Sequence, residues 1–223
     1  MTTSSTTTLT AAPLAPLLEH LFTQAESVNS TAIIDIPHTE RQRLMHSKTE
    51  YLDLYTRLRE LWLPVTRETG RLLYMLARSI HACHIIEFGT SFGISTLHLA
   101  AALRDNGGGR LISCEFEPSK VARARQHLAA GGLDDLVEIR VGDALNTLAS
   151  DLPDTIDLLL LDGAKALYND ILTLVEPRLR TGALIIADNA EYSPDYLQRV
   201  RAPDSGYISV PFAEDVKLSL RAG

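Results

Sequence analysis

The chain has 223 residues, of which 45% are hydrophobic and 22% are charged, and this composition is typical of one globular domain. Its net charge of −7 disfavours a nucleic-acid-binding protein, which usually carries a basic patch. The longest apolar runs are too short to span a bilayer and the first forty residues contain no Lys or Arg, so we expect a cytoplasmic protein without a membrane span, a secretory signal or a transit peptide.

The N-terminal part of the chain has two predicted regions. Residues 1–12 are polar and low in complexity, and we expect them to form a disordered tail. Residues 13–63 are expected to form a helical cap that precedes the rest of the fold. Apolar side chains recur with helical spacing in three stretches, over residues 14–28, about 40–62 and 69–80.

From His84 onward, apolar runs alternate with segments of helical spacing. Nearly continuous apolar runs are typical of parallel strands buried on both faces. The predicted strands cover residues 85–88, 111–114, 137–141, 156–161, 183–187, 207–210 and 216–220, and the predicted helices cover 96–103, 118–130, 144–148, 166–179 and 194–201. We therefore expect one domain over residues 1–223, with a Rossmann-like core over 64–223. This α/β core is doubly wound around a mostly parallel seven-stranded sheet that ends in a C-terminal antiparallel hairpin.

A glycine-rich turn, Glu87-Phe88-Gly89-Thr90-Ser91-Phe92-Gly93, follows the first of these strands. Glycines at such a turn let the backbone approach a ligand. The spacing is not the dinucleotide fingerprint G-x-G-x-x-G, and a tight turn without a ligand explains the segment equally well. Glu115, however, ends the next strand about twenty residues later, where an acid can bind ribose hydroxyls. Together these features favour a nucleoside without a diphosphate, such as S-adenosylmethionine.

Oxygen-bearing side chains end two further strands, with Asp162 after the fourth and Asp188-Asn189 after the fifth. Ligands of open α/β sheets bind outside the carboxyl ends of the strands, and in the usual order these two strands are neighbours. Two carboxylates and an amide oxygen suit a hard cation such as Mg²⁺. A helix cap or a turn explains each residue singly. Their joint placement favours a metal site.

Lys165 lies three residues past Asp162. Beside a divalent cation its ammonium would have a lowered pKa, which suits a general base, whereas a solvated surface lysine is the alternative. Neither of the two cysteines, Cys83 and Cys114, is paired with a plausible base, so nucleophilic catalysis by a thiol is unsupported.

These motifs occur in the order found in the metal-dependent class I O-methyltransferases, the group of catechol O-methyltransferase and the plant caffeoyl-CoA enzymes. The chain resembles this family from about Val65 to its C-terminus, through "VTRETGRLL", "IIEFGTSFGIS", "CEFEP" and "VGDAL". The resemblance implies S-adenosylmethionine as cofactor. It carries over contacts to this cofactor at Val65, Glu87, Gly89, Ser91, Ser95, Glu115, Phe116, Asp143, Ala144 and Asp162.

The later motifs "LDGAKALY" and "IADN" resemble the two metal motifs of the family. The resemblance implies that Asp162, Asp188 and Asn189 hold Mg²⁺ or another divalent cation and that Lys165 is the catalytic base. "VPFAEDVKLSL" resembles the final hairpin, in which Glu214 matches the acid that holds a substrate hydroxyl. Gly163-Ala164 stand where the family often has bulkier residues, which leaves the identity of the acceptor open.

The sequence therefore predicts Mg²⁺-dependent transfer of a methyl group from S-adenosylmethionine to a hydroxyl of a small, catechol-like acceptor with adjacent oxygens. Two alternatives stay open: methylation of an amine or an isolated hydroxyl in natural-product biosynthesis, and a nucleoside-binding module without turnover. A dinucleotide oxidoreductase is disfavoured by the glycine spacing. The expected partner is a small molecule, with neither nucleic acid nor membrane, and a homodimer is one option for the oligomeric state.

Overall fold

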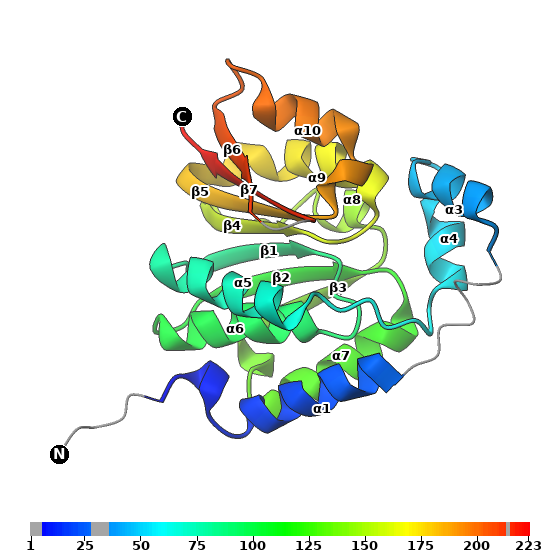
Figure 1. Cartoon of the computed structure of the whole chain (residues 1–223). Helices are drawn as coiled ribbons and strands as arrows, with labels where there is room; N and C mark the ends of the chain where they lie inside the picture. The colour runs from blue at the N-terminus through cyan, green and yellow to red at the C-terminus, as the bar shows by residue number, and fades with distance from the viewer. Residues whose placement is uncertain (1–5, 28–35, 213–214) are drawn as a thin grey trace.

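A seven-stranded sheet lies at the centre of the chain, with helices on both of its faces and a small pair of helices to one side (Figure 1). The structure, a computed structural model, describes residues 6–27, 36–212 and 215–223. The predicted doubly wound α/β fold is confirmed. Among the described residues, no helix combines the length and the apolar character that a bilayer span needs.

The order of the strands is β3-β2-β1-β4-β5-β7-β6. Their bounds are β1 His84–Phe88, β2 Arg110–Glu115, β3 Val137–Val141, β4 Ile156–Leu161, β5 Leu179–Asp188, β6 Tyr207–Pro211 and β7 Val216–Arg221. The first five strands are parallel, whereas β7 pairs antiparallel with both β5 and β6, as the sequence predicts. The direction of winding reverses between β1 and β4, and ligands of such sheets bind in the crevice at this point.

Helices cover the two faces of the sheet in two groups. Their bounds are α1 Leu14–Ser27, α3 His38–Met45, α4 Tyr51–Arg57, α5 Arg67–Ser79, α6 Ile94–Asp105, α7 Pro118–Gly131, α8 Ala144–Thr147, α9 Tyr168–Val175 and α10 Pro194–Arg201. α1, α5, α6 and α7 lie on one face, and α8, α9 and α10 lie on the other (Figure 1). Local signals set their ends: the Thr66 hydroxyl accepts the Thr69 N–H at the start of α5, and Pro118 opens α7.

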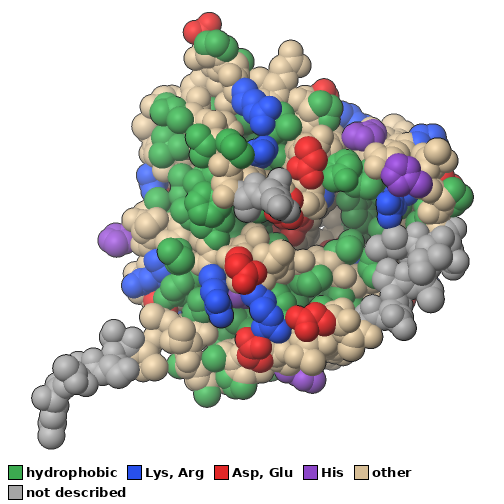
Figure 2. All heavy atoms as spheres, in the orientation of Figure 1, with side chains coloured by type: hydrophobic (Ala, Val, Ile, Leu, Met, Phe, Trp, Pro, Cys, Tyr) green, Lys and Arg blue, Asp and Glu red, His purple; other side chains and the backbone are tan. Residues whose placement is uncertain are grey.

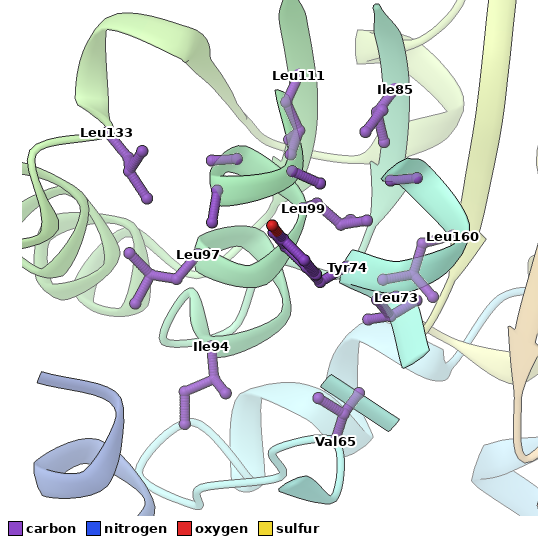
Figure 3. Close-up of a cluster of buried hydrophobic side chains, with 14 of the residues drawn as sticks. Val65, Leu73, Tyr74, Ile85, Ile94, Leu97, Leu99, Leu111, Leu133 and Leu160 are labelled. Atoms are coloured by element: carbon purple, nitrogen blue, oxygen red, sulfur yellow. The ribbon is translucent and has the colours of Figure 1, made fainter. Parts of the chain in front are cut away.

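Buried apolar side chains fill the space between each helical layer and the sheet. On the α5–α6 face, side chains from two helices and three strands converge (Figure 3). They include Leu73 and Tyr74 of α5, Leu97 and Leu99 of α6, and Ile85, Leu111 and Leu160 of the strands, all at most 9% exposed. Burial of one such side chain stabilises the fold by roughly 1.5–3 kcal/mol.

The pair α3 and α4 carries a small apolar core of its own. Its buried members are Ile36, Leu44, Leu54, Leu58 and Leu61. Of the helical cap predicted over residues 13–63, α1 packs on the core instead, so the name cap is kept for residues 36–61 only. The cap therefore holds its shape partly through internal packing, and it stands beside the sheet rather than on one of its faces (Figure 1).

An aromatic stack joins the end of the cap to the core. The rings of Trp62 and Phe92 are parallel, with 4.2 Å between their centroids. The Arg123 guanidinium lies over both rings, 4.9 Å from the first centroid and 4.6 Å from the second. Phe92 belongs to the glycine-rich turn, so the stack ties the chain leaving the cap to that turn.

Three predicted elements differ from the structure. The helix expected over about residues 40–62 is divided into α3 and α4, because the Ser47 hydroxyl accepts the Glu50 N–H at 3.0 Å and offers the backbone a turn instead. The helix expected over 166–179 is α-helical only as far as Val175, because Pro177 cannot donate a backbone hydrogen bond. β5 begins at Leu179 instead of residue 183.

The predicted disordered tail is also too long. Residues 1–5 lie outside the described residues, but Thr8–Thr10 form one turn of 3-10 helix. The backbone N–H of Thr8 donates to Asp105 Oδ2 at 3.0 Å, and its hydroxyl donates to Asp105 Oδ1 at 2.5 Å. The composition of the tail could not reveal this partner, which lies at the end of α6.

Candidate active site

A cavity of about 470 Å³ opens at the carboxyl ends of the parallel strands, between the sheet and the cap. Figure 2 shows a hollow between these two parts of the surface, with acidic side chains beside it. Twelve of the residues that the sequence singles out line the cavity: Val65, Gly89, Ser91, Ser95, Glu115, Phe116, Asp143, Ala144, Asp162, Lys165, Asp188 and Asn189. The topology thus brings segments that are far apart in the sequence into one site.

The structure departs from the prediction at Glu87, which is fully buried and does not line the cavity. Side chains alternate along a strand, so Glu87 shares a face of β1 with Ile85, and α6 covers this face. Its carboxylate accepts hydroxyl hydrogen bonds from Ser95 at 2.6 Å, Thr96 at 2.6 Å and Ser113 at 2.5 Å. Burial raises the pKa of Glu87 although the three hydroxyls favour the charged form. The side chain of Glu87 therefore stabilises the region beneath the glycine-rich turn, between β1, β2 and α6, and does not face the cavity.

The glycine-rich turn brings the chain close to the end of β4. Gly89 has φ +109°, and a Cβ atom there would lie 2.6 Å from the carbonyl oxygen of Asp162. The Ser91 N–H donates to Glu115 Oε2 at 2.8 Å, and the Glu117 N–H donates to Glu115 Oε1 at 3.0 Å. The carboxylate of Glu115 is therefore fixed between two loops at the cavity wall, in the position expected for an acid that binds ribose hydroxyls.

At the neighbouring end of β3, Asp143 is the N-terminal capping residue of helix α8. It also contacts α4, which belongs to the cap. One carboxylate oxygen accepts the Leu145 N–H at 2.9 Å, and the other accepts the Tyr51 hydroxyl at 2.9 Å. Burial and the Asp143 carboxylate raise the pKa of Tyr51 to about 12. Four residues further along α4, the Tyr55 hydroxyl donates to the Gly163 carbonyl at 3.4 Å. Both tyrosines line the cavity, and sequence analysis missed them. Their spacing at i and i+4 on a helix was the available signal.

The ends of β4 and β5 hold an acidic cluster around one lysine. Lys165 Nζ lies 2.9 Å from Asp162 Oδ1 and 3.5 Å from Asp188 Oδ2. The ammonium also donates to the Tyr168 hydroxyl at 2.8 Å, and this hydroxyl donates to the Asp188 carbonyl at 2.7 Å. Lys165 is only 7% exposed. The ends of β4 and β5 therefore lie close together, as expected for neighbouring strands.

The electrostatics of this cluster differ from the prediction for Lys165. Burial opposes its charged form, but the interactions with Tyr168, Asp162 and Asp188 outweigh this effect and raise the pKa of Lys165 well above its usual value. Burial and the nearby Asp162 carboxylate also raise the pKa of Asp188. The predicted lowering of the Lys165 pKa presupposes a cation beside it, whereas here Tyr168 and the two carboxylates set the direction.

The cluster offers oxygen donors of the kind that suit a hard cation. Among the described residues, no three His, Cys, Asp or Glu side chains form a metal-binding group, so the candidate set consists of Asp162, Asp188 and the amide of Asn189. Two partly buried carboxylates that repel each other favour a further positive charge between them. The residues present thus fit a divalent cation such as Mg²⁺.

The C-terminal hairpin contributes a further acid that the sequence analysis did not single out. Glu214 lies outside the described residues, but the adjacent Asp215 lines the cavity and its Oδ2 lies 3.5 Å from Asn189 Nδ2. The negative charge of Asp215 is one of the smaller causes that raise the pKa of Asp188. The signal was its position next to Glu214 in the same segment.

The small residues after Asp162 have a structural cause. A Cβ atom on Gly163 would lie 2.6 Å from the ring of Phe88. A larger side chain at this position would therefore require the ring of Phe88 to move. Gly163 and Ala164 leave one wall of the cavity without a large side chain from the core.

Comparison with known proteins gives matches over most of the chain. Residues 86–190 match the model of a methyltransferase domain. A catechol O-methyltransferase of Niastella koreensis is 34% identical over 128 residues, which cover 56% of this chain and 57% of that protein. A catechol O-methyltransferase of Sus scrofa is 30% identical over 145 residues, which cover 61% of this chain and 77% of that protein. The chain thus spans little more than half the length of some curated relatives that it matches.

Solved structures share the fold over nearly the whole chain. The O-methyltransferase TomG of Streptomyces achromogenes, which is involved in tomaymycin synthesis and was solved in complex with S-adenosylmethionine, is 26% identical. The match covers 90% of this chain and 99% of that chain, with a TM-score of 0.58. The fold described above therefore also occurs in solved proteins.

Proposed function

Because the chain belongs to the class I S-adenosylmethionine-dependent O-methyltransferases, we propose that it transfers a methyl group from S-adenosylmethionine to a hydroxyl of a small acceptor, with a divalent cation such as Mg²⁺. One observation carries this proposal. A single cavity joins the glycine-rich turn and Glu115 to the cluster of Asp162, Lys165 and Asp188. A nucleoside pocket alone would not need two partly buried carboxylates around a lysine.

The cofactor half of the cavity is built mainly from backbone and from fixed polar groups. Glu115 would bind the ribose hydroxyls, and Gly89 lets the chain pass close to the ligand. Bound S-adenosylmethionine supplies a methyl group on a positively charged sulfur. The net negative charge of the nearby acidic cluster favours this cation.

The acceptor half would hold the cation through Asp162, Asp188 and Asn189. Bound Mg²⁺ would hold the acceptor oxygens and lower the pKa of the hydroxyl to be methylated. An acceptor with two adjacent oxygens, such as a catechol, suits such a site because both oxygens can reach one cation. Asp215 lies beside Asn189, where it can accept a hydrogen bond from the second hydroxyl.

Lys165 is the proposed base. Its Nζ atom lies in the gap between the two carboxylates, beside the place where the hydroxyl proton would leave. When the Asp162 and Asp188 carboxylates are neutralised by a bound cation, Lys165 loses the interactions that keep its pKa high. Its amine can then accept that proton. Much of the rate would come from holding the acceptor oxygen in line with the methyl group.

Methyl-transfer assays over catechols, phenols and amines, with chelator or with added Mg²⁺, test this function. We expect transfer to catechols that stops when the metal is chelated and returns when Mg²⁺ is restored. Transfer to amines with full activity in chelator would contradict both the acceptor and the metal. Binding of S-adenosylmethionine without turnover on any acceptor would favour a nucleoside-binding module.

A further inference from the structure

We propose that helix α4 of the cap covers one face of the adenine of the bound cofactor, with Tyr51 and Tyr55 as the contacting side chains. This inference rests on the proposed function for its ligand, S-adenosylmethionine. It assigns part of the cofactor site to the cap, a segment whose role the sequence analysis left undefined.

The position of the base follows from the position of Glu115. Phe116 follows this acid and Val141 of β3 pairs with it, so we infer that a ribose held by Glu115 has its base over Phe116 and the turn at the end of β3. Asp143 and Ala144 form that turn, and both line the cavity. The base thus lies over the ends of β2 and β3, on the side of the cavity toward α4.

The base has a second face, on the side of β4, and the core places no large side chain from residues 163–164 over it. Gly163 and Ala164 at the end of β4 present at most one methyl group, and a larger side chain at Gly163 would require the ring of Phe88 to move. A planar base gains stability when an aromatic ring stacks on its face. Phe88 lies beneath Gly163 and also lines the cavity, but residues 163–164 carry no ring of their own, whereas the cap brings two aromatic rings to this side.

The two tyrosines bridge the gap between these strand ends. The Tyr51 hydroxyl reaches Asp143 after β3 at 2.9 Å, and the Tyr55 hydroxyl reaches the Gly163 carbonyl after β4 at 3.4 Å. Residues at i and i+4 lie on the same face of a helix, so both rings point from α4 into the cavity. Their hydroxyls are thus anchored at both sides of the place where the base lies.

The same side chains connect the cap to the rest of the fold. Tyr51 packs in the core cluster on the α8–α10 face, and Tyr55 contacts both this cluster and the internal core of the cap. Besides them, Lys48 Nζ lies 2.7 Å from Asp170 Oδ2. A base that fills the space beside the two rings adds contacts between cap and core. Binding of the cofactor should therefore hold the cap in place.

Calorimetry with S-adenosylhomocysteine and with 5′-methylthioadenosine tests this inference. Tyr55→Ala and Tyr51→Ala should each weaken the binding of both ligands at least about fivefold and by similar factors, because the lost contact is to the base and not to the amino-acid part. Tyr55→Phe should bind almost as wild type, because the ring is kept. Thr56→Ala, on the exposed side of the same helix, is the matched control.

Hydrogen exchange separates loss of a contact from loss of folding. In the wild type, exchange over residues 38–57 should slow when S-adenosylhomocysteine is added, and this protection should be lost in the Tyr51→Ala/Tyr55→Ala variant while the sheet exchanges as before. Alanine variants that bind both ligands as tightly as wild type would overturn the inference. A wild-type protein that binds neither ligand would refute the proposed function instead.

Discussion

Two acidic sites occupy the same sheet, one fully buried and one partly buried, and they differ in access. Glu87 is closed in beneath the glycine-rich turn, where three hydroxyls occupy its oxygens. Asp162 and Asp188 lie at the ends of β4 and β5, open into the cavity and share a single ammonium. In both sites burial is the largest cause that raises a carboxyl pKa.

The comparison shows that burial and a raised pKa do not by themselves mark a functional site. Glu87 has hydrogen-bond partners for both oxygens and no path to a ligand. The cavity cluster has two carboxylates for one lysine, so one negative charge is left over. An accessible group with uncompensated charge is a candidate for binding a cation, whereas an enclosed and satisfied group is a structural support.

The largest effect is expected for Asp188→Ala, which removes one proposed metal ligand. Methyl transfer should be lost, while affinity for S-adenosylhomocysteine should change little because Glu115 and Asp143 lie elsewhere. The thermal unfolding midpoint should also change little, since Asp162 and Lys165 remain as a balanced pair. The control is Asp195→Ala at an exposed carboxylate. Normal turnover in Asp188→Ala would show that this cluster, like Glu87, is a structural support and not a metal site.

A smaller but still large effect is expected for Lys165→Met. Loss of the base should lower turnover by ~10²–10⁴-fold with almost unchanged cofactor affinity. Two partly buried carboxylates are then left without a positive charge, so the variant should unfold at a lower temperature, and added Mg²⁺ should stabilise it more than the wild type. Lys165→Arg should restore stability but little turnover, because a guanidinium stays protonated. Wild-type turnover in Lys165→Met would exclude the residue as the base.

The smallest effect on activity is expected for Glu87→Gln, whose consequence is for stability. Because folding raises the Glu87 pKa, its stabilising contribution is present below pH 4.5, the usual pKa, and is lost as the pH rises through the folded value. The free energy of unfolding of the variant should therefore improve relative to wild type between pH 4.5 and neutral pH. Urea unfolding of both proteins at the two pH values measures this difference. A difference that is constant with pH would show that Glu87 does not titrate in this range.

The sheet and the placement of the acids could be predicted because they depend on local patterns. Apolar runs that are buried on both faces identify parallel strands, and the topology then brings their carboxyl ends together. Asp162 and Asp188 could be assigned to one site for this reason. The side chain of Glu87 does not line the cavity, and the sequence offered a sign of this, because Ile85 two residues before it places the acid on a buried face of the strand.

The contribution of the cap could not be predicted in the same way. Tyr51 and Tyr55 lie in a helix whose pattern shows only that one of its faces is apolar. Their partners, Asp143 and Gly163, follow about 90 and 110 residues later. A pattern along the chain does not reveal which distant turn meets a helix, so this part of the site required the structure.

The stack of Trp62 on Phe92 has an optical consequence. Trp62 is the single tryptophan of the chain, so all indole fluorescence comes from the junction between the cap and the glycine-rich turn. Its emission depends on the contacts with Phe92 and with the Arg123 guanidinium. The protein therefore carries an intrinsic reporter at the point where cap and turn meet, and no label is needed to follow their separation in solution.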